Sequence, residues 1–89
     1  MKSLHLIVTG NVEQGYFLAW VYDHAVVLGL NGWVRRIETG RAELLAQGND
    51  GGLEKLKVVL KQGGPATGIL DVKAAWIDYD TVYDGFEMR

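Results

Sequence analysis

Residues 9–20, TGNVEQGYFLAW, form the stretch of this sequence best suited to bind an anion. An apolar run from Leu4 to Val8 leads into a segment containing Gly10 and Gly15, and a helical apolar pattern follows. A turn at the start of a helix can direct several unpaired backbone N–H groups at one point, where the helix dipole also favours negative charge. The stretch contains no lysine, arginine, serine or cysteine, so it offers backbone donors without a cationic or nucleophilic side chain.

Other polar residues are weaker candidates for chemistry. Arg35, Arg36 and Arg41 are predicted to form a small basic cluster, sufficient for one anion but not for a nucleic-acid duplex. His5 and His24 have no carboxylate, cysteine or second histidine at ligand spacing, so we expect neither a metal site nor a general base there.

The acidic segment near the carboxyl end contains Asp78, Asp80 and Asp84 followed by Gly85. It has some features of a calcium-binding loop. However, it lacks the glycine at the sixth position and the glutamate at the twelfth that such loops use. We therefore expect a solvated acidic loop, and no metal or cofactor is predicted for this chain.

The composition indicates one small globular domain spanning residues 1–89. The chain is 48% hydrophobic and 22% charged, and its formal net charge of −2 argues against a nucleic-acid partner. It contains no cysteine, which excludes a disulfide or a thiolate nucleophile. No stretch has the length of a signal peptide or a membrane span, so we expect a cytoplasmic location and no membrane partner.

The hydrophobic pattern predicts an alternation of strands and helices. Strands are expected at residues 4–8, 33–37, 41–47, 69–76 and 86–88. The first helix begins at Gly15 and is capped by Gly29, with an apolar stripe of Phe17, Val21, Ala25 and Leu28. The second helix has Asp50 as a candidate cap and a stripe of Leu53, Leu56 and Leu60, and it ends at Gly63-Gly64-Pro65.

The predicted order is strand, helix, strand, strand, helix, strand, with one short extra strand. This order is typical of an α+β, ferredoxin-like β-α-β-β-α-β sandwich, in which an antiparallel sheet carries two helices on one face.

The sequence resembles the acylphosphatase family over almost its whole length. That family has a strand ending in Gly-x-Val-Gln-Gly-Val-Gly-Phe-Arg, a helix carrying Leu-Gly-Leu, then Gly-Trp-Val-x-Asn and a hairpin ending in Gln-Gly. The matching residues here are Gly10, Val12, Phe17, Leu28-Gly29-Leu30, Gly32-Trp33-Val34, Gly40-Arg41-Ala42-Glu43, Gln47-Gly48, Gly64-Pro65 and Gly85-Phe86.

The resemblance implies a fold and a reaction. Members of the family hydrolyse small acyl phosphates without a metal or an organic cofactor. Their loop N–H groups hold the phosphate, an arginine at the end of the loop clamps it, and an asparagine on the second strand orients the attacking water. Phosphate or an acyl phosphate is therefore the expected small-anion partner, while the sequence identifies no protein partner.

This chain departs from the family at both catalytic positions. Leu18 stands at the arginine position and Arg36 at the asparagine position. The loop is changed as well: Glu13, Gln14, Gly15 and Tyr16 precede Phe17 where the family has Gln-Gly-Val-Gly. Two lost charge-assisted hydrogen bonds are worth roughly 3–6 kcal/mol, or about two to four decades in affinity or rate.

These departures leave three hypotheses. The first is a divergent member with impaired acyl phosphate hydrolysis that retains small-anion binding by the loop of residues 13–17. The second is an active acylphosphatase in which Arg36 replaces the missing clamp; alternatively, Arg36 points to solvent or pairs with Glu13, Glu38 or Glu43. The third is a protein-interaction module that uses a sheet edge.

Overall fold

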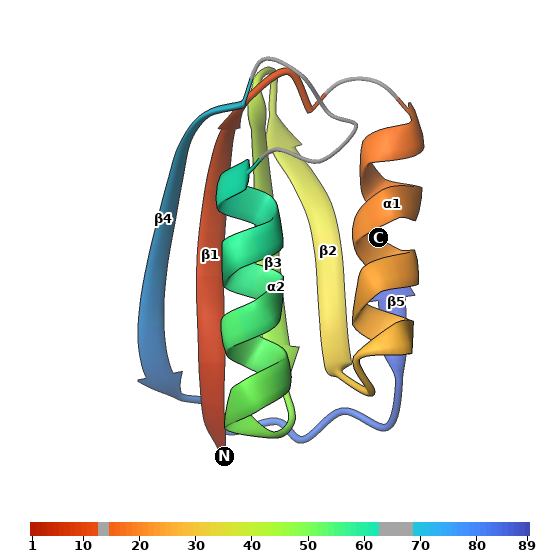
Figure 1. Cartoon of the computed structure of the whole chain (residues 1–89), viewed down its shortest axis with the longest axis vertical. Coiled ribbons are helices and arrows are strands. Elements are labelled where there is room, and N and C mark those ends of the chain that lie inside the picture. Colours follow the sequence, from red (N-terminus) through yellow and green to blue (C-terminus); the bar gives the residue numbers. More distant parts are fainter. Residues whose placement is uncertain (13–14, 63–68) are drawn as a thin grey trace.

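The computed structural model describes residues 1–12, 15–62 and 69–89. The elements follow one another in the predicted order (Figure 1). They are β1 (Lys2–Gly10), α1 (Gly15–Val27), β2 (Asn31–Glu38), β3 (Arg41–Gln47), α2 (Asp50–Gln62), β4 (Ile69–Asp78) and β5 (Phe86–Met88). The ferredoxin-like arrangement is confirmed, and β1, β2 and β4 each extend beyond the predicted bounds by one or two residues at one or both ends.

The strands form one sheet in the order β4-β1-β3-β2-β5, and both helices cover the same face (Figure 1). β1 pairs antiparallel with β3 and β4, and β2 pairs antiparallel with β3. The four longer strands thus form the predicted antiparallel sheet, and the short extra strand β5 adds to it by pairing parallel with β2. The chain leaves β4 at one edge and crosses the sheet before β5 begins, so β5 enters in the direction of β2.

The core lies between the sheet and the two helices. Leu4, Leu6 and Val8 of β1 are fully buried, and each faces a buried residue of β3 across the ladder. Both predicted helical stripes point into this core: Phe17, Val21 and Ala25 from α1 and Leu53, Leu56 and Leu60 from α2 are buried, with Leu28 partly buried against them. Burial of these apolar surfaces is the main force that fixes the helices on the sheet.

The ends of the helices are capped in two different ways. Gly29 has a φ of 71°, and the Leu30 N–H donates to the Ala25 carbonyl at 2.9 Å, as in a left-handed carboxyl cap. At α2, the Gly52 N–H donates to Asn49 Oδ1 at 2.7 Å. Asn49 is therefore the amino-terminal cap, and the prediction of Asp50 was wrong by one residue because Asp50 is already helical.

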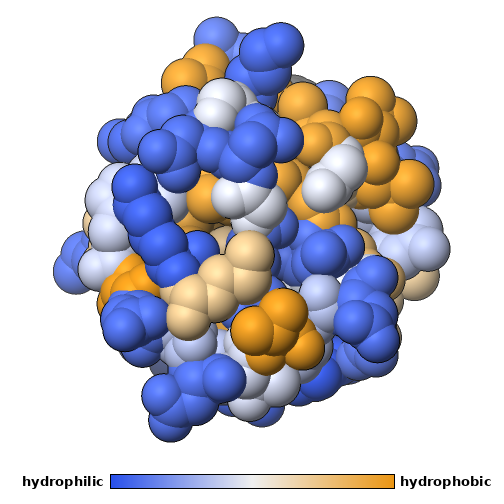
Figure 2. Space-filling model, turned by 90° about the horizontal axis from the view of Figure 1, so that it is seen from below, coloured by the Kyte–Doolittle hydropathy of each residue, from blue (hydrophilic) through white to orange (hydrophobic). Residues whose placement is uncertain are grey.

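α1 also presents apolar side chains to solvent near its carboxyl end. Val26 and Val27 are 51% and 84% exposed. Figure 2 looks at the molecule from below, the end at which α1 finishes, and shows hydrophobic side chains gathered on the side that α1 occupies in Figure 1. Because α1 is apolar on more than its core face, sequence periodicity alone predicts its buried side less sharply than it does for α2.

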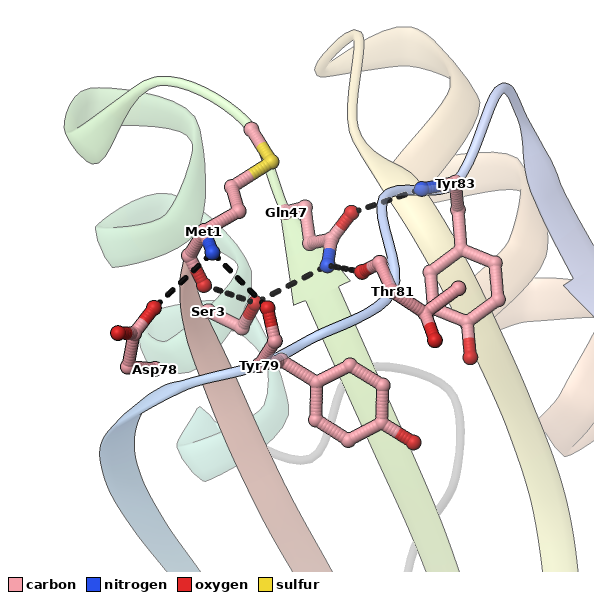
Figure 3. Close-up of polar contacts among 7 residues, drawn as sticks. All are labelled: Met1, Ser3, Gln47, Asp78, Tyr79, Thr81 and Tyr83. Atoms are coloured by element: carbon pink, nitrogen blue, oxygen red, sulfur yellow. Dashed lines mark hydrogen bonds and ion pairs between the residues drawn. The ribbon is translucent and has the colours of Figure 1, made fainter.

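The connection between β4 and β5 crosses the sheet face that the helices leave open, and Gln47 fastens it there (Figure 3). The Gln47 side chain is fully buried; its Nε2 donates to the Thr81 carbonyl at 2.7 Å and to Ser3 Oγ at 3.1 Å. Its Oε1 accepts the Tyr83 N–H at 3.0 Å. Both polar atoms of this buried amide are thus hydrogen-bonded, and these bonds fix the path of the β4–β5 connection.

Candidate functional site

The candidate site lies at the end of the sheet where β1 finishes, α1 begins and β2 finishes (Figure 1). Gly10 has a φ of 140°, and its N–H donates to the carbonyl of Gly40 in the β2–β3 turn at 2.9 Å. The Val12 N–H donates to the Gly10 carbonyl at 3.0 Å, and the Val12 side chain is fully buried. The beginning of the predicted anion loop is therefore tied to the neighbouring turn and to the core.

The first turn of α1 comprises Gly15, Tyr16, Phe17 and Leu18. The N–H groups of a helix's first turn have no acceptor within the helix, and the helix dipole places partial positive charge there. Phe17 is fully buried, and its ring centroid lies 6.2 Å from that of Trp20. This anchor fixes the start of the helix on the sheet. The predicted loop residues Glu13 and Gln14 lie outside the described residues.

Leu18 is partly buried and packs against the hydrophobic core from the first turn of α1. Its side chain contains no hydrogen-bonding group. At this position the site therefore has aliphatic carbon where the family resemblance implies a cation.

Arg36 lies on β2 directly opposite Ala42 of β3. Directly opposite residues in an antiparallel ladder share a face of the sheet. Ala42 is fully buried with the core, so Arg36 belongs to the face covered by the helices, although it is itself exposed. It lies near the end of β2, at the same end of the sheet as the start of α1 (Figure 1).

The predicted basic cluster is divided between the two faces of the sheet. Arg35 lies opposite Glu43, and Arg41 lies opposite Thr9, so both belong to the open face. Arg41 also pairs with Glu38 at 3.0 Å. The prediction of one cluster was wrong because consecutive strand residues point to opposite faces.

Glu43 connects Arg35 and His5 on the open face. Arg35 Nε and Nη2 donate to Glu43 Oε1 at 2.9 and 2.8 Å, and His5 Nε2 contacts Oε2 at 2.7 Å. Burial by itself raises the pKa of Glu43, but the bonds from His5 and Arg35 outweigh it and hold the pKa below its usual value. His5 thus has a carboxylate partner that its sequence neighbours did not indicate.

Sequence reasoning missed an aromatic cluster on the open face. The Trp33 indole N–H donates to the Tyr83 hydroxyl at 3.1 Å, and the Arg35 and Arg89 guanidinium carbons lie 5.0 and 5.3 Å from the Trp33 ring centroid. The Trp33 hydrogen bond lowers the pKa of Tyr83, while the hydrogen bond between the two tyrosines raises that of Tyr79. These residues hold the β4–β5 connection against the sheet.

Two features are absent from the part of the chain that the structure describes. No group of three or more histidine, aspartate or glutamate side chains is positioned there to hold a metal ion. None of the described helices is long and apolar enough to cross a membrane.

Comparison with known proteins places this geometry in context. The family model described as Acylphosphatase matches residues 4–88. A relative from Pelotomaculum thermopropionicum, named acylphosphatase, is 34% identical over 84 residues, covering 94% of this chain and 91% of the relative. One of the same name from Anaeromyxobacter sp. is 35% identical over 89 residues, covering 100% of this chain and 96% of the relative. A crystal structure of acylphosphatase from Bacillus subtilis superposes with a TM-score of 0.90 at 27% identity, covering 100% of this chain and 99% of that one.

Proposed function

Because this chain belongs to the acylphosphatase family, we propose that it binds a small anion, phosphate or an acyl phosphate, at the start of α1. We further propose that it hydrolyses acyl phosphates only feebly. The anion site comprises the backbone N–H groups of the loop and first helical turn, residues 13–18. The relatives' name supplies the substrate class, and this chain's own residues supply the argument for reduced activity.

The packing of Leu18 against the core is the observation that carries the proposal. Donors aimed at the oxygens of a phosphoryl group stabilise the negative charge on those oxygens in the transition state of transfer. An arginine in that role is worth about 10³–10⁵ in rate in other phosphoryl-transfer enzymes. Leu18 supplies no donor, so the anion retains the backbone N–H groups and loses the two-pronged clamp.

A second candidate function is supported by the position of Arg36 opposite Ala42 on the helix-covered face. A guanidinium at that end of the sheet can approach the loop from the side of the strand. In that case the protein is an active acylphosphatase in which Arg36 and the loop amides stabilise the transferred phosphoryl group. The water-orienting amide of the family would still be missing.

The two functions predict different results with benzoyl phosphate and inorganic phosphate. For the impaired protein, phosphate raises the melting temperature, and benzoyl phosphate disappears at close to its spontaneous rate. For the active enzyme, hydrolysis is well above the spontaneous rate and is abolished by Arg36→Ala but retained in Arg41→Ala, a control on the open face. The absence of any phosphate-dependent rise in melting temperature would contradict the anion site.

A further inference from the structure

The sheet ends in an edge strand at β4, at the opposite side of the strand order from β5. Within the described residues, β4 is the outermost strand and its ladder partner is β1. It runs from Ile69 to Asp78, whereas the strand at the opposite edge, β5, has three residues. Figure 1 shows β4 beside the helical layer, with α2 in front of β1. An edge of this length presents a row of N–H and C=O groups to any further strand.

The outer strand also exposes apolar side chains. Leu70 is 80% exposed and Trp76 is 40% exposed. Trp76 lies opposite the buried Leu4, so it belongs to the helix-covered side of the sheet, and Lys2 Nζ lies 4.5 Å from its ring centroid. Long edges with exposed apolar residues are unusual unless charge or a partner protects them.

Two charges of opposite sign lie on one face of β4, in its first half. Asp71 and Lys73 are both exposed, and they lie opposite Thr9 and Ile7 of β1. The β1 ladder therefore offers neither charge a partner of opposite sign. A strand added on the outer side would meet both of them directly.

Among the two-fold registers open to a second copy of this strand, one places the opposite charges directly across from each other. Antiparallel pairing centred on Val72 places Asp71 opposite Lys73 of the second copy, and Lys73 opposite its Asp71. Centring the pairing on Asp71 or on Lys73 instead places like charges opposite each other, which is unfavourable. The charge pattern is thus complementary to itself in the Val72 register.

The same register also places apolar groups together. In the regular part of the ladder, Val72 comes opposite its own counterpart and lies between the two charge pairs. In a closed two-fold dimer the same edge of both copies is buried, so this edge is not available to a third copy.

We propose that this protein forms a homodimer through antiparallel pairing of two β4 strands about Val72, joining the two sheets into one. Dimerisation through β4 is independent of the proposed anion binding. A single strand edge is small beside the roughly 1,200–2,000 Å² of stable interfaces, so the dimer is weak and its population rises with protein concentration.

Charge exchange tests the register. In Asp71→Lys the pairing opposes two lysines at each end, and in Lys73→Asp it opposes two aspartates. We expect each variant, measured by sedimentation equilibrium, to dimerise about tenfold more weakly than the parent. A mixture of the two variants should dimerise again, because the two lysines of one variant then lie opposite the two aspartates of the other. The double variant Asp71→Lys/Lys73→Asp should behave as the parent, because each lysine again lies opposite an aspartate.

Two results would overturn the proposal. One is a parent protein that stays monomeric at the highest concentration reached. The other is dimerisation unchanged in both single variants, which would assign self-association to another surface such as the exposed valines of α1. Circular dichroism of each variant verifies folding, and both substituted residues are exposed, so the folded state should persist.

Discussion

Arg36 lies directly opposite Ala42 across the β2–β3 ladder, and the Ala42 side chain is fully buried beneath the helices. This relationship assigns Arg36 to the helix-covered face, whereas its neighbour Arg35 pairs with Glu43 on the open face. Leu18 approaches the same end of the sheet from the first turn of α1 (Figure 1). The two positions that differ from the family pattern thus lie on the two elements that meet at the proposed anion site.

Replacing Gln47 with methionine should destabilise the protein strongly. The substitution keeps a buried chain of similar size but removes the bonds to the Thr81 carbonyl and the Tyr83 N–H. Leaving these groups unpaired should lower the free energy of unfolding by about 2–4 kcal/mol, measured by urea denaturation. Ser3→Ala is the control: Gln47 keeps both bonds to the connection, and the loss should be about 1 kcal/mol. Equal losses in the two variants would contradict the assigned role of Gln47.

Gly32→Ala should be among the most damaging single-methyl additions in this chain. Gly32 has a φ of 134°, and a Cβ there would lie 1.8 Å from the Leu45 carbonyl oxygen, a backbone atom of the neighbouring strand β3. We expect a loss of roughly 3 kcal/mol or more in the free energy of unfolding.

Gly85→Ala is the matched control for this prediction. The Gly85 carbonyl accepts the Gly32 N–H at 3.0 Å, but a Cβ on Gly85 meets no atom within 4 Å. Its effect on the urea midpoint should be small. A Gly32→Ala protein as stable as Gly85→Ala would show that the strand can shift away from β3.

Titration of Glu43 should make the free energy of unfolding vary with pH in the acid range. Its pKa is lowered in the folded protein, so its contribution is complete above the unfolded value of about 4.3 and is lost as the pH falls through the folded pKa. Glu43→Gln removes this titration. The free energy of unfolding should therefore fall less steeply between neutral pH and pH 3 in the variant than in the parent, as followed by urea denaturation at each pH. Parallel profiles would contradict a lowered pKa.

The elements of the fold could be predicted because they depend on local patterns. The four-residue spacing of Phe17, Val21 and Ala25 marks the core face of α1, and these residues are buried. Gly29 marks the end of the same helix through its left-handed backbone. The family resemblance added the two substituted positions, Leu18 and Arg36, which no periodicity would have identified.

The remaining features depend on contacts between distant residues. Trp33 meets Tyr83 only because the β4–β5 connection crosses the open face, and His5 meets Glu43 because β1 and β3 are neighbours. The parallel direction of β5 has the same origin, since a crossing connection leaves no local signal. The anion loop itself is specified by Glu13 and Gln14, which lie outside the described residues, so its expected ligand role stays a prediction.

The most direct test of the proposed function is to restore the family residues and measure hydrolysis of benzoyl phosphate. The double variant Leu18→Arg/Arg36→Asn returns the clamp and the water-orienting amide, and its melting temperature verifies that the change at Leu18 leaves it folded. We expect kcat/KM to rise at least about a hundredfold over the parent. A restored variant no more active than the parent, with the parent already well above the spontaneous rate, would contradict the proposal that Leu18 and Arg36 impair the chemistry.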